Sequence, residues 1–248
     1  MRIEDERDID GLREAGRAVA RTLRDMMAAA EPGMTTRALD DLGAAALEAA
    51  GARSAPRLCY EFPGATCISI NEEAAHGIPG DRLLRAGDIV NVDVSAELDG
   101  YFADTGASFV LPPSTPAKDL LCETARAALD SAMKEARAGR LLNRIGQAIE
   151  RAAAGAGFAT LRDLGSHGVG RNLHEAPRFI PNYYDPSDLR RLADGMVITI
   201  EPFVSTAATS CSTARDGWTL VSGTGNLSAQ FEHTMIIRHG EPLIMTLP

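Results

Sequence analysis

Two copies of one acidic phrase decide the fold of this chain: Gly87-Asp88-Ile89-Val90-Asn91-Val92-Asp93 and Gly195-Met196-Val197-Ile198-Thr199-Ile200-Glu201. Each copy has a turn glycine, an alternating β-branched run, and a carboxylate six positions after the glycine. A strand that ends on a carboxylate presents that charge at a fixed point and angle. We therefore predict two related half-domains that face each other across an acidic site, where a pair of divalent metal ions would find oxygen ligands.

The rest of the chain follows the same order in both halves. Helical periodicity runs through 8–30 and 35–51, and again through 117–138 and 141–154. Short β-type runs follow each helix pair, at 66–71, 89–94 and 107–111, and then at 158–161, 196–201, 218–221 and 230–237. We predict an α+β fold with antiparallel strands. It forms a single domain, 1–248, whose halves 1–111 and 117–248 are joined by the Pro-rich linker 112–116.

The composition argues against several classes of protein. The 248 residues carry 34 acidic and 25 basic side chains, and the net charge of −9 disfavours nucleic acid and anionic membranes as partners. The four cysteines form no C-x-x-C pair, so we expect free thiols in a reducing cytoplasm. The N-terminus lacks the apolar core of a secretory signal, and no apolar stretch approaches the roughly 20 residues of a membrane span.

Four acids and one histidine are candidates for a metal centre: Asp93, Asp104, His167, Glu201 and Glu232. Asp93 and Glu201 end the two acidic strands, and a hairpin at 99–100 would bring Asp104 beside Asp93. Four carboxylates that converge without cations would repel one another, whereas two divalent ions would neutralise them and lower the pKa of a bound water towards 7. Oxygen ligands with a single imidazole suit Mn²⁺, Fe²⁺ or Co²⁺, and Zn²⁺ is also compatible.

Six segments together resemble the methionine aminopeptidases: Asn71–Pro79, Asn91–Asp93, Asp104–Thr105, Ser166–Glu175, Thr199–Pro202 and Ser228–Thr234. Glu201 lies 34 positions after His167, which is similar to the type I subclass, because type II enzymes carry a long helical insertion there. The resemblance implies the pita-bread fold, in which two pseudo-symmetric halves form a curved antiparallel sheet flanked by helices. It also implies a metalloaminopeptidase that removes the N-terminal methionine of new polypeptides when the next residue is small.

The resemblance also implies roles for individual residues. The five candidate ligands would hold two metal ions, with Asp104 and Glu232 bridging them, and Glu201 would also move a proton from water to the leaving amine. His174 would donate to the developing oxyanion, and His76 would act at the scissile amide. The residues implied to bind substrate are Phe62, Cys67, His76, His174 and Trp218. A monovalent cation is implied near Asn91, Val94 and Ser228.

Two positions depart from the family pattern and leave the substrate range open. Cys59 stands where an aromatic residue often lines the pocket, and Ala176 replaces the second glutamate of the common His-Glu-Glu-Pro sequence. The general enzyme and a second copy with narrower substrates both stay open. The substrates would be peptide and nascent-protein N-termini. We expect a monomer, with the transient ribosome association of a co-translational enzyme.

Two alternative functions remain. A proline-specific peptidase of the same fold group, like prolidase or aminopeptidase P, would share the metal site. Such enzymes carry an extra N-terminal domain that 248 residues do not accommodate, and Cys67 and Trp218 favour methionine. A metal-free binding homologue would tolerate the loss of ligands, whereas all five candidate ligands are present here.

Overall fold

The computed structural model describes all residues from 1 to 248. Its five helices are α1 (Glu6–Ala29), α2 (Thr36–Ala49), α3 (Ala55–Tyr60), α4 (Pro116–Glu135) and α5 (Asn143–Gly155). Its strands in the first half of the chain are β1 (Arg53–Ser54), β2 (Cys67–Ile70), β3 (Glu73–Ala75), β4 (Ile89–Leu98) and β5 (Tyr101–Val110). The later strands are β6 (Ala159–Thr160), β7 (Gly165–Gly168), β8 (Glu175–Pro181), β9 (Val197–Ile200), β10 (Phe203–Ser205), β11 (Ser212–Thr213), β12 (Leu220–Val221), β13 (Ser228–Gln230), β14 (His233–Ile236) and β15 (Leu243–Ile244).

The four long helices form where the apolar periodicity predicted them. Asp5 caps the start of α1, because its side chain accepts hydrogen bonds from the backbone N–H groups of Arg7 and Asp8. Thr35 caps the start of α2 in the same way, because its hydroxyl accepts from the N–H of Ala38. The predicted helices are therefore confirmed, with ends shifted by a few residues.

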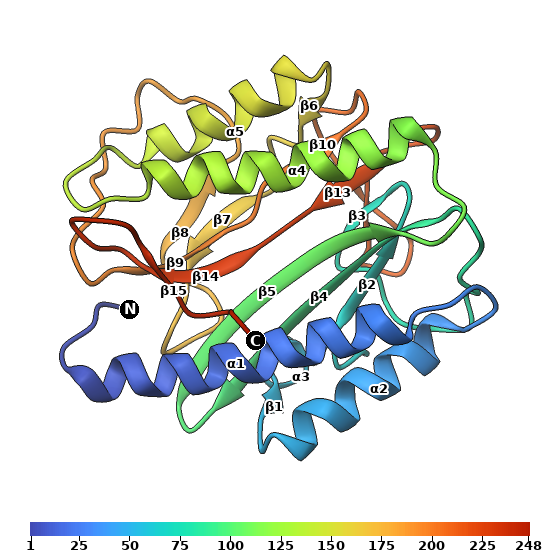
Figure 1. Cartoon of the computed structure of the whole chain (residues 1–248), viewed down its shortest axis with the longest axis horizontal. Helices are drawn as coiled ribbons and strands as arrows, with labels where there is room; N and C mark the ends of the chain where they lie inside the picture. The colour runs from blue at the N-terminus through green and yellow to red at the C-terminus, as the bar shows by residue number, and fades with distance from the viewer.

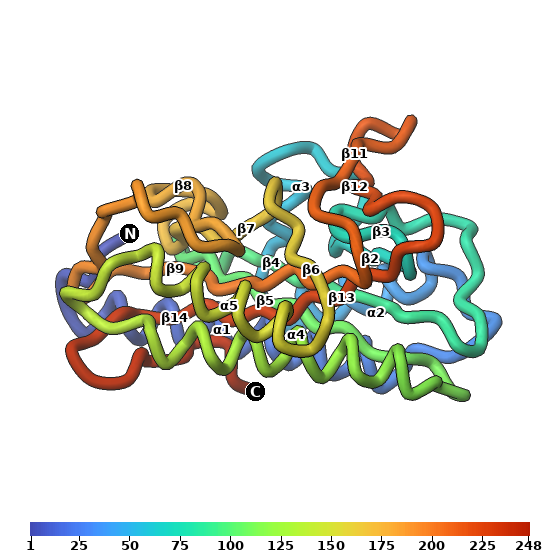
Figure 2. The backbone as a smooth tube through the Cα atoms, turned by 90° about the horizontal axis from the view of Figure 1, so that it is seen from above, coloured from blue at the N-terminus to red at the C-terminus, as the bar shows by residue number.

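All four long helices cover one side of the strands, as Figures 1 and 2 show. The helix α1 packs against β4 and β5, the helix α2 packs on α1 and beside β1 and β2, and helices α4 and α5 lie over the later strands. The main hydrophobic core fills the space between these helices and the strands. On the other side lie the short helix α3, the strands β3, β8, β11 and β12, and connecting loops, so that side of the strands has no layer of long helices.

The first acidic phrase forms the start of a long antiparallel hairpin. Gly87 has a φ of 86°, a conformation that glycine adopts readily, and β4 follows it directly. Leu98 pairs with Tyr101 across the turn at 99–100, which confirms the predicted hairpin. The strands are longer than predicted, because β4 and β5 pair along their full lengths. The second acidic phrase is built alike, since Gly195 has a φ of 77° and is followed by β9.

The strand predicted over 230–237 is interrupted, and the reason is a change of partner. Residues 228–230 form β13 and residues 233–236 form β14. Between them Phe231 bridges to Ala107, and the N–H of Glu232 donates to the carbonyl of Gly106 at 2.9 Å. The chain thus pairs with β5 at this point, which joins the sheet of β4 and β5 to the five-stranded sheet β15-β14-β9-β7-β8. None of the helices combines the length and apolar composition that a membrane span needs.

Candidate metal centre and substrate cavity

Asp93 and Asp104 lie on neighbouring strands of the hairpin. Asp93 pairs with Gly106, and Ser95 pairs with Asp104, so the two aspartates are two residues apart in register and project from the same face of the sheet. The backbone N–H of Asp104 donates to the hydroxyl of Thr234 at 2.9 Å. This bond ties the hairpin to β14 beside the two carboxylates.

Glu201 and Glu232 are brought together by the second sheet. Ile200 pairs with His233 at the ends of β9 and β14, so the next residue in each direction is one of the two glutamates. The N–H of Glu201 donates to the hydroxyl of Ser166 at 2.9 Å, which ties it to β7. Both glutamates therefore occupy fixed backbone positions at the junction between the two sheets.

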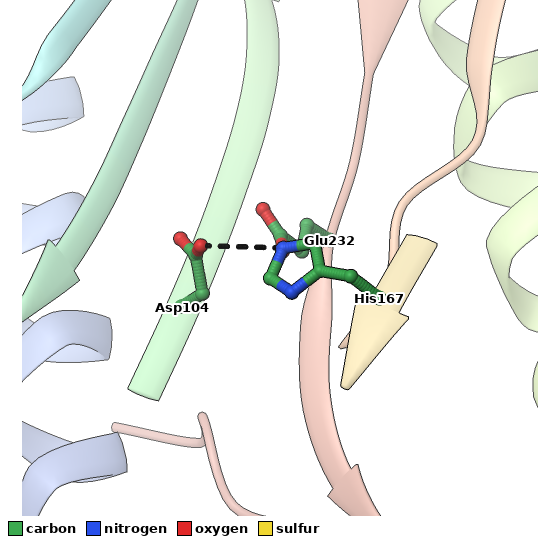
Figure 3. A group of neighbouring side chains, drawn as sticks. All are labelled: Asp104, His167 and Glu232. Carbon is green, nitrogen blue, oxygen red and sulfur yellow. Dashed lines mark ion pairs between the residues drawn. The ribbon is translucent and has the colours of Figure 1, made fainter. Parts of the chain in front are cut away.

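His167 reaches the same point from β7. Its backbone N–H donates to the Thr199 hydroxyl on β9 at 3.1 Å. Its Nε2 atom lies 3.3 Å from Oε1 of Glu201 and 3.8 Å from Oδ2 of Asp104. Figure 3 shows the side chains of Asp104 on β5, His167 on β7 and Glu232 between β13 and β14 converging on one point, and their nearest ligand-type atoms lie within 4.8 Å of one another.

The protonation of His167 leaves a lone pair directed at the carboxylates. Burial, and then the nearby His174, lower the pKa of His167 to about 3, so the ring is neutral at pH 7. Its Nδ1 lies 3.0 Å from the carbonyl oxygen of Gly168, to which it can only donate. The Nε2 atom therefore carries a lone pair, which faces the oxygens of Asp104 and Glu201. This contact is unfavourable while the carboxyl groups are ionised, and it becomes favourable when a cation, or a proton on a carboxyl group, lies between them.

The carboxyl groups show the same need for positive charge. Burial, and then neighbouring carboxylates, raise the pKa values of Asp104, Glu201 and Glu232 well above their usual range, and burial raises the pKa of Asp93 to about 6. Oδ1 of Asp104 and Oε1 of Glu232 are buried without a hydrogen-bond partner. Because buried polar atoms are normally paired, these oxygens and the His167 lone pair fit divalent cations.

A cavity of about 360 Å³ opens beside these residues, and its lining includes residues of α3 and β8, two elements that lie on the side of the strands away from the long helices. The residues proposed from the sequence that line it are Phe62, Cys67, His76, Asp93, Asp104, His167, His174, Glu201 and Trp218. Glu232 is not part of the wall and lies behind it, only 2% exposed. The acidic cluster and the apolar residues expected to hold a side chain thus share one cavity.

Phe62 and Trp218 form the aromatic part of the wall. Their rings meet edge to face, with centroids 5.3 Å apart and an interplanar angle of 85°. Trp218 is held by Asp216, whose Oδ1 accepts from the N–H groups of Trp218 and Thr219, and Trp218 stays half-buried because one side faces the cavity. Cys67 is 7% exposed, so it adds a sulfur surface to this wall.

The backbone at His76 has an unusual conformation. His76 has a φ of 55°, in the left-handed region that few non-glycine residues occupy. The following Gly77 passes so close to β2 that a Cβ atom there would lie 2.2 Å from the carbonyl oxygen of Ile68. The N–H of Gly77 also donates to the Ser69 hydroxyl at 3.1 Å. Packing against β2 therefore determines where His76 is held.

His174 lies in the loop between β7 and β8 and faces His167. The two imidazole rings are 4.1 Å apart between centroids. Glu175 orders the loop, because its Oε1 accepts from the N–H groups of Arg171 and Asn172. Partial burial, and then the nearby His76, lower the pKa of His174 to about 4, so this ring is also neutral at pH 7.

The sequence reasoning missed several residues of the site. Tyr60, at the end of α3, lines the cavity and makes a hydrogen bond with His174, whereas Cys59 is not among the lining residues. Gln230 donates from Nε2 to Oε2 of Glu232 at 3.0 Å. Arg178 and Phe179 of β8 also line the cavity. The pattern around Cys59 could have pointed to Tyr60, since an aromatic residue was expected at the neighbouring position.

The residues proposed for a monovalent cation make separate polar contacts. Asn91 donates from Nδ2 to Oε1 of Gln230 at 2.9 Å, and the Ser228 hydroxyl donates to Oγ of Ser222 at 3.1 Å. Val94 is fully buried in β4. Ala176, the other departure from the family pattern, is exposed on β8. A monovalent cation near these residues stays a prediction.

Comparison with known proteins gives one consistent result. Metallopeptidase family M24 matches residues 10–239 of this chain. The chain is 45% identical over 247 residues to methionine aminopeptidase 2 of Bacillus subtilis (strain 168), with 99% of each sequence covered. A crystal structure of methionine aminopeptidase from Thermotoga maritima has a TM-score of 0.96 and 33% identity, with 100% of both chains covered. These similarities confirm the predicted pita-bread fold.

A more distant similarity concerns the proline-specific alternative. A prolidase from Pyrococcus furiosus has a TM-score of 0.78 and 20% identity, with 99% of this chain and 65% of that one covered. At this identity the likeness shows a shared fold and nothing further. By sequence identity and by the share of each chain covered, this chain is more similar to the methionine aminopeptidases than to the proline-specific prolidase.

Proposed function

This chain belongs to metallopeptidase family M24 and, within it, to the methionine aminopeptidases, and from that premise we propose that it releases the N-terminal methionine of peptides and nascent proteins. The observation that carries the proposal is the shared cavity. Buried carboxylates and a neutral histidine occupy one part of its wall, and Cys67 and Trp218 occupy another. A methionine side chain bound at the second part would place its peptide bond near the first.

The proposed metal ligands are Asp93, Asp104, His167, Glu201 and Glu232. Two divalent ions would be held there, with Asp104 and Glu232 bridging, and the unpaired oxygens of these two residues support that arrangement. When bound, such ions make water acidic enough to attack at neutral pH and polarise the scissile carbonyl. An oxygen-rich set with one imidazole favours Mn²⁺, Fe²⁺ or Co²⁺ and also accepts Zn²⁺. We retain the monovalent cation near Asn91, Val94 and Ser228 as a proposal.

Three residues of this chain would carry the proton and charge movements. Glu201 accepts the proton of the attacking water and passes it to the leaving amine. Its Oε1 accepts a hydrogen bond from the Thr199 hydroxyl at 3.1 Å, which supports a fixed orientation. His174 donates to the carbonyl oxygen as negative charge develops there, and His76 donates to the scissile amide.

The methionine side chain would lie against Phe62, Cys67 and Trp218. A thioether is unbranched and polarizable, and it packs well against aromatic edges and sulfur. The edge-to-face contact of Phe62 and Trp218 supports a wall whose shape is set before substrate binds. We propose that the residue after methionine must be small, as the family resemblance implies.

The remaining expectations belong to the same proposal. The short separation of His167 and Glu201 favours a type I enzyme. We propose one catalytic domain whose halves, 1–111 and 117–248, are joined at 112–116, and which acts as a monomer in the cytoplasm with transient ribosome association.

The test is release of free methionine by metal-stripped protein from Met-Ala-Ser and Met-Lys-Ser peptides, with and without added Mn²⁺ or Co²⁺. We expect metal-dependent cleavage of Met-Ala-Ser and little cleavage of Met-Lys-Ser. A third peptide, Ala-Pro-Ser, separates a methionine aminopeptidase from a proline-specific peptidase. Cleavage of Ala-Pro-Ser in preference to Met-Ala-Ser would favour a proline-specific peptidase, and no cleavage with any metal would favour a binding homologue.

A further inference from the structure

We propose that Tyr60 is a positioning residue for His174, and that its hydroxyl decides which nitrogen of the His174 ring carries the proton. The Tyr60 hydroxyl lies 2.7 Å from Nδ1 of His174. It is the only hydrogen bond that the His174 ring makes within the protein. The inference rests on the proposed function, because it concerns how His174 can donate to a substrate.

Tyr60 is held in place by the structure around it. It is the last residue of α3, whose first turn is capped by the Ser54 hydroxyl accepting from the N–H of Arg57. The same hydroxyl donates to the carbonyl of Ala65 at 2.7 Å, which ties the helix to the segment before β2. Glu61 follows the last residue of the helix and has a left-handed φ of 55°. These two bonds of the Ser54 hydroxyl hold the short helix α3, and with it the Tyr60 ring, at the cavity.

The exposure of Tyr60 shows that its hydroxyl is not needed by the core. The side chain is 44% exposed although it lines the cavity. Its ring lies 5.6 Å from the His174 ring between centroids, at an angle of 57°. An exposed tyrosine could direct its hydroxyl to water at no cost, so its contact with Nδ1 is a specific feature of this site.

The bond has a direct consequence for the chemistry of His174. A neutral imidazole has one N–H donor and one acceptor nitrogen, and the group bound to one nitrogen selects the tautomer. A phenol donates more readily than it accepts, because its lone pairs are delocalised into the ring. Nδ1 therefore accepts from Tyr60, and the proton is on Nε2. Nε2 is the nitrogen left free for a substrate, and in this tautomer it is a donor, as stabilisation of an oxyanion requires.

The reverse tautomer would not serve the same purpose. If Nδ1 donated to Tyr60, Nε2 would carry a lone pair and would repel a carbonyl oxygen that gains negative charge. His174 is also held by its contact with the His167 ring and by the loop bonds to Glu175, but neither contact involves Nδ1. Tyr60 is thus the residue that can select the productive tautomer.

The test is Tyr60→Phe, which keeps the ring and removes only the hydroxyl. For Met-Ala-Ser we expect kcat to fall about tenfold with KM changed less than about twofold, a smaller loss than the 10²–10³-fold that follows removal of an oxyanion donor. The second readout is the ¹⁵N spectrum of the histidine rings in metal-free and Zn²⁺-loaded protein, with His174 assigned from the signals lost in His174→Gln. We expect the Nε2–H form in the parent protein and a mixture of tautomers in Tyr60→Phe.

Tyr184→Phe is the matched control, because Tyr184 is also exposed, at 37%, and lies outside the cavity lining. It should leave both readouts unchanged. An unchanged kcat with an unchanged tautomer in Tyr60→Phe overturns the proposal. A raised KM with an unchanged kcat overturns it too, because Tyr60 would then contribute to substrate binding and not to the orientation of the His174 proton. An Nδ1–H form in the parent protein overturns it too. The ¹⁵N readout needs no turnover, so absence of peptidase activity would refute the proposed function without deciding the role of Tyr60.

Discussion

The backbone N–H of Glu232 donates to the carbonyl oxygen of Gly106 at 2.9 Å, and this bond holds Glu232 beside Asp104. Gly106 and Asp104 lie on the same strand, β5, two residues apart. The Thr105 hydroxyl adds a second bond by donating to the carbonyl of Glu232 at 2.8 Å. Two acids that lie 128 positions apart in the sequence are therefore held together by backbone bonds, independently of any charge between them. The acidic site is assembled by strand pairing. The backbone hydrogen bonds hold the carboxylates close together in spite of the repulsion among them.

Replacing Glu201 by Gln tests its proposed proton transfer. The amide that replaces the carboxylate could still accept a hydrogen bond from Thr199, but it has no basic oxygen to take a proton. We expect kcat/KM for Met-Ala-Ser to fall by about 10²–10⁴-fold while the fold, monitored by circular dichroism and thermal unfolding, is unchanged. Glu48→Gln, an exposed change on α2, is the control and should keep full activity. Turnover by Glu201→Gln close to that of the parent enzyme would remove Glu201 from the mechanism.

The stability of the metal-stripped protein should fall as the pH rises. The folded state raises the pKa of Asp93 to about 6 and those of Asp104, Glu201 and Glu232 well above their usual range. The folded protein then binds more protons than the unfolded chain, so the free energy of unfolding decreases with pH, by up to about 1.4 kcal/mol per pH unit for each carboxyl group that keeps its proton.

The measurement is urea unfolding of stripped protein between about pH 6.5 and 8.5, where Asp104, Glu201 and Glu232 set the slope, because Asp93, with its pKa of about 6, is already mostly ionised there. Histidine residues with lowered pKa values act in the opposite direction, but chiefly below the unfolded histidine pKa of about 6.5. Glu232→Gln removes one of the raised groups, so its slope against pH should be shallower. Adding Mn²⁺ should raise the stability most at the alkaline end. A stripped protein that is equally stable across this range would contradict the predicted repulsion.

Trp218 should matter more for methionine than for an isosteric side chain without sulfur. Trp218→Ala removes one of the two rings that meet edge to face, and we expect kcat/KM for Met-Ala-Ser to fall at least about tenfold. The preference for Met-Ala-Ser over norleucyl-Ala-Ser should fall about two- to tenfold, because the sulfur–aromatic contact is lost. Trp218→Phe keeps an aromatic ring and should retain most of this preference. An equal loss for both peptides would show that Trp218 makes no contact specific to the methionine sulfur, and no loss for either would place Trp218 outside the pocket.

Local sequence patterns predicted the parts of this fold that depend on local physics. Apolar periodicity marked the four long helices, because each buries one stripe of residues against the strands. The alternating runs after Gly87 and Gly195 marked β4 and β9, and the turn at 99–100 marked the hairpin. These features are encoded within a few residues of where they occur, so they could be read without knowledge of the tertiary contacts.

Other parts depend on contacts between distant segments and carried no such signal. The six-residue helix α3 is too short for periodicity to show, so the placement of Tyr60 beside His174 could not be predicted. The break between β13 and β14 arises because Glu232 pairs with β5. The cavity wall contributed by Arg178 and Phe179 depends on how β8 lies against β7. The family resemblance supplied the residues of the site, and strand pairing supplied their arrangement.

Gly77 offers a test of how the backbone of β2 positions His76. A Cβ atom at Gly77 would lie 2.2 Å from the Ile68 carbonyl oxygen and 2.9 Å from Cα of Ser69, and backbone atoms cannot move aside without shifting the strand. We expect Gly77→Ala to lower the free energy of unfolding by about 1–3 kcal/mol and to lower kcat for Met-Ala-Ser, because His76 must move with it. Gly80→Ala is the matched control, since the nearest atom to a Cβ there is 4.0 Å away. Urea unfolding and steady-state kinetics of both variants measure the two effects. Equal stability of the two variants would show that β2 can shift freely, and the close approach at Gly77 would then not be what holds His76 in its left-handed conformation.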